Sequence, residues 1–303
     1  SYLKPGPDGR IYGATKQGHE LFSARPEIGE ESRGYPGGAL LAYDPATGVT
    51  EYLGVLRPQD GVVNGVVDMA RRRIYFKTEP RTHFLIYEID TRQVIDKGRV
   101  GTWTRYIDMD EKGNVWIPNY AGRVTMYDVE RDELRELAVR PEPGSVYKTP
   151  YACIIGGKQG GRNRKLYGGD FTRIQEFDLA AASETEVPMR QVCRAVPEPY
   201  ENAQDIHAME RDAIGRIYWF AEVKGDPNQL LIMRYDPDRG EGECLGYMVD
   251  EGLARLREHV DSYGKPAQNH TNIQGAAFGA DGTLFLMATY PYYILEFPQL
   301  AAD

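Results

Sequence analysis

Cysteine is scarce in this sequence and is not arranged for metal binding. The 303 residues contain only Cys153, Cys193 and Cys244, and no two of them form a Cys-x-x-Cys pair. This spacing excludes the common structural zinc motifs. Each cysteine falls in a segment with strand character, so we expect three small, buried apolar side chains.

Long apolar runs and an excess of positive charge are also missing. No stretch approaches the roughly 18 to 20 apolar residues of a membrane-spanning helix. The net charge of −9 argues against a nucleic-acid partner, because binding to phosphates needs a basic face. An acidic substrate stays open, since a local basic cleft can form on an acidic protein.

The familiar catalytic motifs are absent as well. The sequence contains no phosphate-binding P-loop, no Gly-x-Ser-x-Gly elbow, no His-Glu-x-x-His pair and no EF-hand loop. No serine stands among the polar residues that could form a Ser-His-Asp triad. Any active site must therefore be built from residues that are distant in the sequence.

A repeated β-pattern dominates what is present. The stretch 105–129, RYIDMDEKGNVWIPNYAGRVTMYDV, reads as three short strands separated by a DEKGN turn and an AG turn. A fourth strand over about 134–139 would complete a four-stranded antiparallel sheet. Such a unit cannot bury both of its faces alone and needs copies of itself on either side.

Five further copies of the pattern are found, each with a turn, a β-rich pair and a third-strand signature. The six pairs are Ile11-Tyr12, Ile74-Tyr75, Val115-Trp116, Leu166-Tyr167, Ile217-Tyr218 and Leu284-Phe285. Their spacing of about 41 to 67 residues fits the blades of a β-propeller better than the strands of a β-sandwich. We predict an all-β fold, a single β-propeller domain over residues 1–303 with six recognisable blades.

The two ends of the repeat array do not match. The sequence begins with Ser1-Tyr2 rather than Met and shows no signal peptide. Its first residues look like an innermost strand, whereas the last repeat stops after its third strand. We therefore expect an upstream segment that carries an export signal, a closing strand or a seventh blade, and we expect a periplasmic or extracellular location.

The connections differ between the two faces of the predicted propeller. Most turns between the first and second strands of a blade are short, which is typical of purely structural connections. The opposite face has a long polar insertion over 16–38 and a segment over 249–264. In the latter, Leu253, Leu256 and Val260 have the i, i+3, i+7 spacing of a short amphipathic helix.

Polar and aromatic residues gather on that elaborated face, where first strands begin and second strands end. The catalytic candidates are His83, Arg105, Tyr151, His207 and His270. The candidates for ligand binding are Asn64, Tyr106, Asn119, Tyr120, Asn272, Gln274, Tyr290 and Tyr292. Further polar residues expected there are Lys77, Glu79, Arg81, Asp170, Asp205 and Glu222. Any one of them is more simply a surface or packing residue, but their convergence predicts a functional pocket.

This set of residues on this scaffold resembles the β-propeller polysaccharide lyases, in repeat architecture and in residue types. The resemblance implies β-elimination on a uronate-containing glycan. In that reaction a cation neutralises the carboxylate, a His or Tyr removes a proton, and a Tyr or His protonates the leaving oxygen. Arg105, His83, His207 and Tyr151 would fill these roles. Asn and Gln side chains would orient the sugar and tyrosines would stack on it, with no cofactor required or with a divalent metal such as Mn, Zn or Ca.

Two other functions stay open. His207, Glu222 and His270 would coordinate a divalent ion in a lactonase or hydrolase of the propeller type, although the characteristic segments of the lactonases are not found. A non-catalytic propeller would use the same face to bind a small molecule, an oligosaccharide or a protein. The sequence leaves the oligomeric state open.

Overall fold

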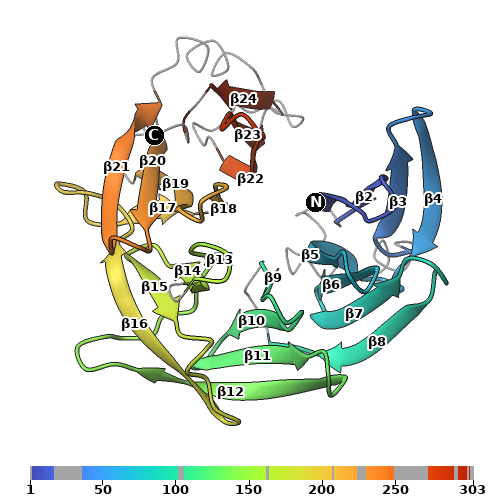
Figure 1. Cartoon of the computed structure of the whole chain (residues 1–303), viewed down its shortest axis with the longest axis horizontal. Coiled ribbons are helices and arrows are strands. Elements are labelled where there is room, and N and C mark those ends of the chain that lie inside the picture. Colours follow the sequence, from blue (N-terminus) through green and yellow to red (C-terminus); the bar gives the residue numbers. More distant parts are fainter. Residues whose placement is uncertain are drawn as a thin grey trace, which may run out of the picture. The chain divides into compact units, whose positions relative to one another are not determined.

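The computed structural model describes residues 2–16, 36–101, 106–161, 164–206, 208–223, 230–248, 272–289, 293–298 and 300. Strands and turns make up these ranges, and none of the described residues is helical. The strands form antiparallel sheets that follow one another along the chain (Figure 1). The predicted all-β propeller with four-stranded blades is confirmed. The amphipathic segment predicted over 249–264 lies outside the described residues.

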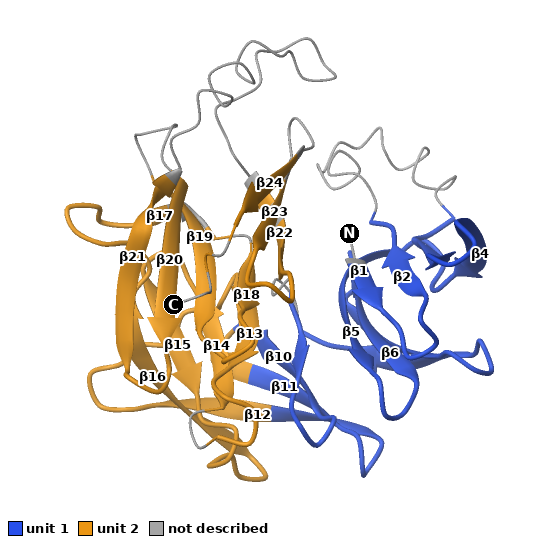
Figure 2. Cartoon of the chain, turned by 45° about the horizontal axis from the view of Figure 1, so that its top comes forward, with its two compact units in different colours: residues 1–120, 124–136 blue, residues 121–123, 137–303 orange. Residues whose placement is uncertain are grey.

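The described chain divides into two compact units (Figure 2). Unit 1 comprises residues 1–120 and 124–136, and unit 2 comprises residues 121–123 and 137–303. Each unit contains sheets of the predicted repeat. The described ranges contain no helix with the length and hydropathy of a membrane span.

Unit 1 begins with two complete four-stranded sheets. Blade 1 has the order β1 (Tyr2–Pro5), β2 (Ile11–Ala14), β3 (Ala39–Asp44) and β4 (Val49–Val55). Blade 2 has the order β5 (Gly61–Asp68), β6 (Arg73–Glu79), β7 (His83–Glu88) and β8 (Val94–Arg99). Most of blade 3 also belongs to unit 1, with β9 (Asp108–Met109), β10 (Val115–Asn119), β11 (Arg123–Asp128) and β12 (Glu133–Pro141). Residue 123 and the residues of β12 from 137 on belong to unit 2. The fourth strand that the sequence predicted at about 134–139 is therefore β12.

Unit 2 contains the sheets of the last three repeats. Blade 4 consists of β13 (Ala152–Gly156), β14 (Lys165–Gly169), β15 (Arg173–Phe177) and β16 (Glu186–Arg194). Blade 5 consists of β17 (Ala203–Asp205) and β18 (Met209–Arg211), which both pair with β19 (Ile217–Val223), and of β20 (Leu230–Asp236) and β21 (Glu241–Met248). The last sheet contains β22 (Asn272–Phe278), β23 (Leu284–Thr289) and β24 (Tyr293–Phe297).

One strand pairing in unit 2 does not follow the repeat. Residues Ala138–Pro141 of β12 pair in parallel with Glu186–Met189 of β16. The bonds from Ala138 N to Thr185 O and from Val139 N to Gly122 O hold this end of β12 in place. A parallel pair between strands of successive blades leaves no signal in hydrophobic periodicity, so the sequence did not predict it.

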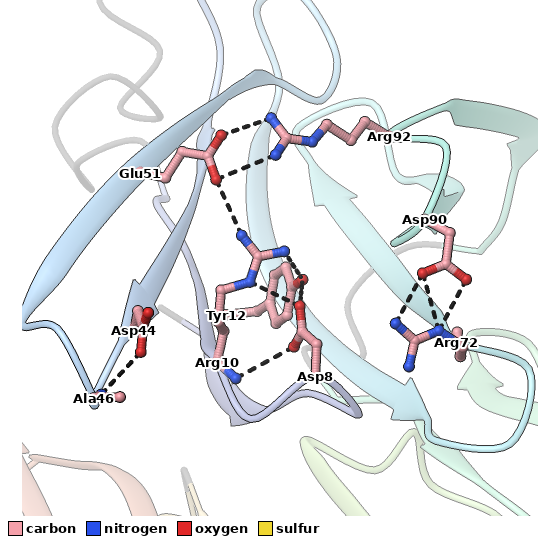
Figure 3. A network of polar contacts seen from close by, with 9 residues as sticks. All are labelled: Asp8, Arg10, Tyr12, Asp44, Ala46, Glu51, Arg72, Asp90 and Arg92. Carbon is pink, nitrogen blue, oxygen red and sulfur yellow. Dashed lines mark hydrogen bonds and ion pairs between the residues drawn. The ribbon is translucent and has the colours of Figure 1, made fainter.

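Several of the turns between first and second strands are built around an aspartate. In unit 1, Asp8 accepts hydrogen bonds from Arg10 Nε at 2.7 Å and from the Tyr12 hydroxyl at 2.8 Å. Figure 3 shows this cluster, in which Arg10 also bonds to Glu51, and Glu51 in turn bonds to Arg92. These polar side chains form hydrogen bonds with one another, which agrees with the prediction that this turn is purely structural.

The same arrangement recurs in other blades. Asp110 accepts a bond from Trp116 Nε1 at 2.8 Å, and in unit 2 Asp212 accepts bonds from Arg216 Nε at 2.6 Å and from the Tyr218 hydroxyl at 3.1 Å. The glycine of each such turn has a positive φ, as at Gly113, where φ is 94°. Only glycine adopts this conformation without steric cost, which explains its recurrence in the repeat.

The aromatic residue of several β-rich pairs packs against an aromatic residue of the next blade. In unit 1, Tyr75 lies 5.5 Å from Tyr127 between ring centroids. In unit 2, Tyr167 lies 5.7 Å from Tyr235. Burial raises the pKa of Tyr75 and of Tyr235 to about 12, so both rings stay neutral. Each such pair contributes about 0.5–1.5 kcal/mol beyond the area it buries.

The cysteines only partly match the expectation. All three lie in strands, and Cys153 is buried in β13. Cys193 is half-buried and Cys244 is exposed on β21, so the prediction that all are buried is wrong. Both Cys193 and Cys244 lie on the outermost strands of their blades, where one face of the sheet meets solvent.

Candidate functional site

Several of the predicted site residues lie outside the described residues. They are Arg105, His207, His270, Tyr290 and Tyr292. The side chains of Asn272 and Gln274 are likewise not described, although their backbone belongs to β22. The described candidates fall at the ends of strands in blades 2 and 3 of unit 1 and in blades 4 and 5 of unit 2.

In unit 1, the candidates of blade 2 come together at one end of its sheet. We call this region the blade 2 loop end and define it as residues 57–60, 77–83 and 96–101. His83 begins β7 and pairs in register with Arg99 of β8. Residues directly opposite in an antiparallel pair have Cβ atoms about 4.5–5.5 Å apart, so these two side chains are neighbours.

A carboxylate orients His83. The Nδ1 atom of His83 lies 2.8 Å from Asp96 Oδ1, and Arg57 Nε donates to Asp96 Oδ2 at 3.1 Å. Burial raises the pKa of Asp96, but the hydrogen bonds from His83, from Gly98 N and from Arg57 outweigh it and hold that pKa below its usual value. A histidine whose Nδ1 is held by a carboxylate presents Nε2 to a ligand, as in many acid–base sites.

A buried acid lies beside this pair. Asp60 is 1% exposed, and its Oδ2 accepts hydrogen bonds from Arg57 Nη1 and from Thr78 Oγ1, both at 3.0 Å. Its Oδ1 is buried without a hydrogen-bond partner among the described residues. Arg57 thus bridges Asp60 and Asp96, and the ion pair with Asp60 compensates the buried charge.

Two arginines of the blade 2 loop end are held by neutral acceptors. Arg81 Nη2 donates to Gln59 Oε1 at 2.7 Å, and Arg99 Nε donates to the carbonyl oxygen of Arg81 at 3.2 Å. Both residues are exposed. Neither guanidinium group forms an ion pair within the part of the chain that the structure describes. Their positive charges can therefore pair with an anionic ligand.

The other polar candidates of blade 2 are tied to the fold. Lys77 is fully buried and pairs in register with Asn64, which is half-buried. Glu79 forms an ion pair with Lys16 at 3.2 Å. A ligand-binding role for Asn64 stays a prediction.

The candidates of blade 3 in unit 1 show one close approach. Asn119 is buried, its Oδ1 accepts the bond from Tyr120 N at 2.7 Å, and its Nδ2 donates to Thr125 Oγ1 at 3.4 Å. A Cβ atom added to Gly101 would lie 1.5 Å from Asn119 Oδ1, so only glycine fits there. Tyr106 is half-buried and Tyr120 is exposed. Their roles in binding stay predictions.

In unit 2, Tyr151 and Asp170 lie at the corresponding end of blade 4. We call residues 148–151, 170–173 and 194–195 the blade 4 loop end. The ring of Tyr151 lies 5.8 Å from that of Phe171, with 40° between the planes. Asp170 is buried, and its Oδ1 accepts bonds from Thr172 N, Thr172 Oγ1 and Arg173 N. Asp170 therefore shapes this loop.

No metal centre emerges from the described residues. They contain no group of three or more His, Cys, Asp or Glu side chains arranged to hold an ion. Of the predicted metal set only Glu222 is described, and in β19 it pairs in register with Asp205. The metal hypothesis that joins it to His207 and His270 stays a prediction.

Residues that sequence reasoning missed are Arg57, Asp60, Asp96 and Arg99. Asp96 is 13 residues from His83 and lies on the outermost strand of the blade, where polar residues are ordinary. Cross-strand register alone brings the two together.

Comparisons with known proteins place the fold. No protein-family model and no curated protein matches the chain. Among solved structures, a nidogen/laminin complex is 9% identical, with a TM-score of 0.57 over 97% of this chain and 91% of that chain. A Bacteroides uniformis protein provisionally named a 6-phosphogluconolactonase is 14% identical, with a TM-score of 0.57 over 98% and 80%. The protein U3-55K is 8% identical, with a TM-score of 0.55 over 95% and 72%. At these identities the likenesses support the β-propeller fold and nothing finer.

Proposed function

We propose that the protein is a carbohydrate-active lyase that cleaves uronate-containing oligosaccharides or polysaccharides by β-elimination. The observation that carries the proposal is His83, oriented by Asp96 and placed opposite Arg99 in the sheet register. This arrangement supplies a base and a cation side by side. The same two groups are what elimination next to a carboxylate requires.

The reaction divides between these residues as follows. Arg99, with Arg81, neutralises the uronate carboxylate and so acidifies the proton on C5. Nε2 of His83 removes that proton, the C–H electron pair forms the C4–C5 double bond, and the C4–O bond breaks. The imidazolium then returns the proton to the leaving oxygen, so the step needs no oxidant or metal. Asp96 stabilises the imidazolium while it carries the charge.

The candidates outside the blade 2 loop end are not needed for this step. The catalytic roles of Arg105, Tyr151, His207 and His270 stay predictions, as do the binding roles of Asn64, Asn119, Asn272, Gln274, Tyr106, Tyr120, Tyr290 and Tyr292.

The test is the ultraviolet absorbance of an unsaturated uronate during incubation with a panel of uronate oligosaccharides, with and without EDTA. We expect activity in the native protein and a loss of about 10²- to 10⁴-fold in His83→Ala, because a general base is removed. Asp96→Asn should lose about 10- to 100-fold through misorientation of the imidazole. Arg92→Gln, in the polar cluster of Figure 3, is the matched control and should keep full activity.

Two results would count against a lyase. One is the absence of an unsaturated product across the panel, and the other is full activity in His83→Ala. Sensitivity to EDTA would show that a divalent metal shares the site.

A non-catalytic binding propeller is the second candidate. It is favoured by the similarity in fold to a chain from a nidogen/laminin complex, since propellers of that kind are found bound to other proteins. In this case the exposed Arg81 and Arg99 would recognise an acidic partner. Binding of an acidic oligosaccharide or protein without any unsaturated product would support it.

A further inference from the structure

In unit 2, the blade 4 loop end carries an exposed aromatic ring and two exposed cationic side chains, those of Lys148 and Arg173. Phe171 is 41% exposed, and its ring lies 5.8 Å from that of Tyr151. Lys148 Nζ donates to Thr172 Oγ1 at 3.1 Å. Neither Lys148 nor the exposed Arg173 forms an ion pair within the described ranges, although the chain as a whole carries a net charge of −9.

The backbone holds this ring in a fixed place. The carbonyl oxygen of Phe171 accepts a bond from Ala203 N at 2.8 Å, and that of Thr172 accepts one from Ala195 N at 3.0 Å. Asp170 holds the same turn from inside through Thr172 and Arg173. Because this backbone is already ordered, a ligand that covers the ring has only the side-chain rotamer of Phe171 to fix.

The cation beside the ring is also fixed. Lys148 N donates to Gln175 Oε1 at 3.1 Å, and Gln175 Nε2 donates to the carbonyl oxygen of Lys148 at 2.6 Å. Gln175 is fully buried, so the backbone of Lys148 is tied to the interior of the blade. The bond from Lys148 Nζ to Thr172 Oγ1 places the ammonium group next to the turn that carries Phe171.

We infer that Tyr151, Phe171, Lys148 and Arg173 form a binding subsite for an acidic sugar unit. A pyranose ring has one apolar face of C–H groups, which suits an exposed aromatic ring, and its carboxylate suits the two cations. A protein partner would need about 800 Å² of surface on each side, whereas two rings and two cations match one or two sugar units. The acidic-sugar class rests on the proposed function, but the subsite does not require that the protein cleaves the chain.

Titration calorimetry with a saturated uronate oligosaccharide tests the subsite, and a neutral oligosaccharide of the same linkage is the comparison ligand. The His83→Ala background prevents turnover. We expect Phe171→Ala to weaken binding of both ligands roughly tenfold, because the ring contributes stacking to either sugar. Arg173→Gln should weaken binding of the acidic ligand alone by about fivefold to tenfold. Phe171→Tyr should retain binding.

Two control variants come from the same unit. Phe285 is also exposed, on β23, and Phe285→Ala should leave the affinity unchanged. Arg239 pairs with Asp236 on a turn of blade 5, and Arg239→Gln should also bind normally. Equal affinities for His83→Ala with and without Phe171→Ala, or no binding of the acidic oligosaccharide at all, would overturn the subsite.

The outcomes separate the subsite from the lyase proposal. Binding that depends on Phe171, without any unsaturated product from the native protein, supports the subsite and rejects the lyase. Product formation by the native protein, together with equal affinities of His83→Ala and His83→Ala/Phe171→Ala for the oligosaccharides, supports the lyase and rejects the subsite.

Discussion

The blade 2 loop end in unit 1 and the blade 4 loop end in unit 2 share one backbone frame. In blade 2, Val100 N donates to the carbonyl oxygen of Thr82 at 2.8 Å. In blade 4, Ala195 N donates to the carbonyl oxygen of Thr172 at 3.0 Å. Each bond closes the ladder between the third and fourth strands at the same point. The repeat therefore reproduces this backbone hydrogen bond in both blades, whereas the side chains of the two loops differ.

The residues that follow these threonines differ in chemistry. His83 is paired in register with Arg99, and Arg173 is paired with Arg194. The histidine has its own carboxylate, Asp96, at 2.8 Å. Arg194 is paired with Glu198 instead, and Arg173 remains without an ion pair in the described ranges. The same backbone frame thus carries an oriented acid–base group in blade 2 and an exposed arginine in blade 4.

The acids that support the two loops come from different places. Asp170 lies inside the blade 4 loop and accepts four hydrogen bonds from its own turn and from Gln175. In blade 2, Asp60 comes from the preceding connection and accepts two side-chain bonds, from Arg57 and Thr78. The blade 4 loop is therefore supported from within, whereas the blade 2 loop depends on a neighbouring segment.

The largest expected effect is on the stability of the blade 4 loop. Asp170→Ala leaves four donors without their acceptor and should lower the free energy of unfolding by about 3 kcal/mol. Asp60→Ala removes two side-chain bonds together with an unpartnered buried oxygen, so it should cost only about 1–2 kcal/mol. Urea unfolding followed by far-ultraviolet circular dichroism measures both. An Asp60→Ala loss as large as that of Asp170→Ala would contradict the difference in support.

Replacing Thr82 or Thr172 by glycine should change stability by a smaller amount, and the two substitutions should differ in direction. Thr82 has a φ of 57°, a conformation that costs a β-branched residue about 1 kcal/mol or more. Thr82→Gly should therefore leave stability unchanged or raise it slightly. Thr172→Gly removes the hydroxyl that bonds to Asp170 and Lys148, and it should cost about 1.5 kcal/mol.

The same denaturant titrations check this pair of substitutions. The Ala form of each threonine is the control, because it removes the hydroxyl without freeing the backbone. If both glycine variants lose equal stability, the strain at Thr82 does not distinguish the two loops.

The sequence predicted the frame of these loops but not their side-chain partners. Glycines at turns, β-rich pairs such as Ile74-Tyr75 and third-strand signatures are local signals, and they correctly predicted the blades. His83 and Asp96 meet because the register between β7 and β8 shifts between His83 and Leu85. Such a bulge moves every later side chain by one position, and no local pattern in the sequence encodes it.

The structural role of Asp170 was not predicted, for a related reason. The sequence placed Asp170 only among the polar residues of the elaborated face. Its four donors come from backbone and side chains whose directions depend on the folded turn. Phe171 was not predicted as a site residue, because a single exposed aromatic residue forms no recognisable sequence pattern.

The smallest expected effect is a pH dependence of stability that Asp96 confers on the blade 2 loop end. Asp96 has a folded pKa below its usual value of about 3.9, because hydrogen bonds from His83, Gly98 and Arg57 outweigh its burial. A lowered pKa means that the ionised acid stabilises the fold above the unfolded pKa. This stabilisation is lost as the pH falls through the folded pKa. Since the Asp96 side chain is 41% exposed, solvent limits the contribution to below about 1 kcal/mol.

The free energy of unfolding of the native protein and of Asp96→Asn should therefore differ most near pH 6 and converge below about pH 4. Urea titrations across this range, with His83→Gln added in both backgrounds, isolate the part that belongs to the pair. If the two free energies of unfolding still converge at low pH when His83 is replaced, the lowered pKa of Asp96 is due to Arg57 and the backbone of Gly98 instead. If the difference in free energy of unfolding between the native protein and Asp96→Asn stays constant with pH, Asp96 orients His83 without a net electrostatic contribution. Blade 2 would then resemble blade 4, in which polar contacts shape the loop.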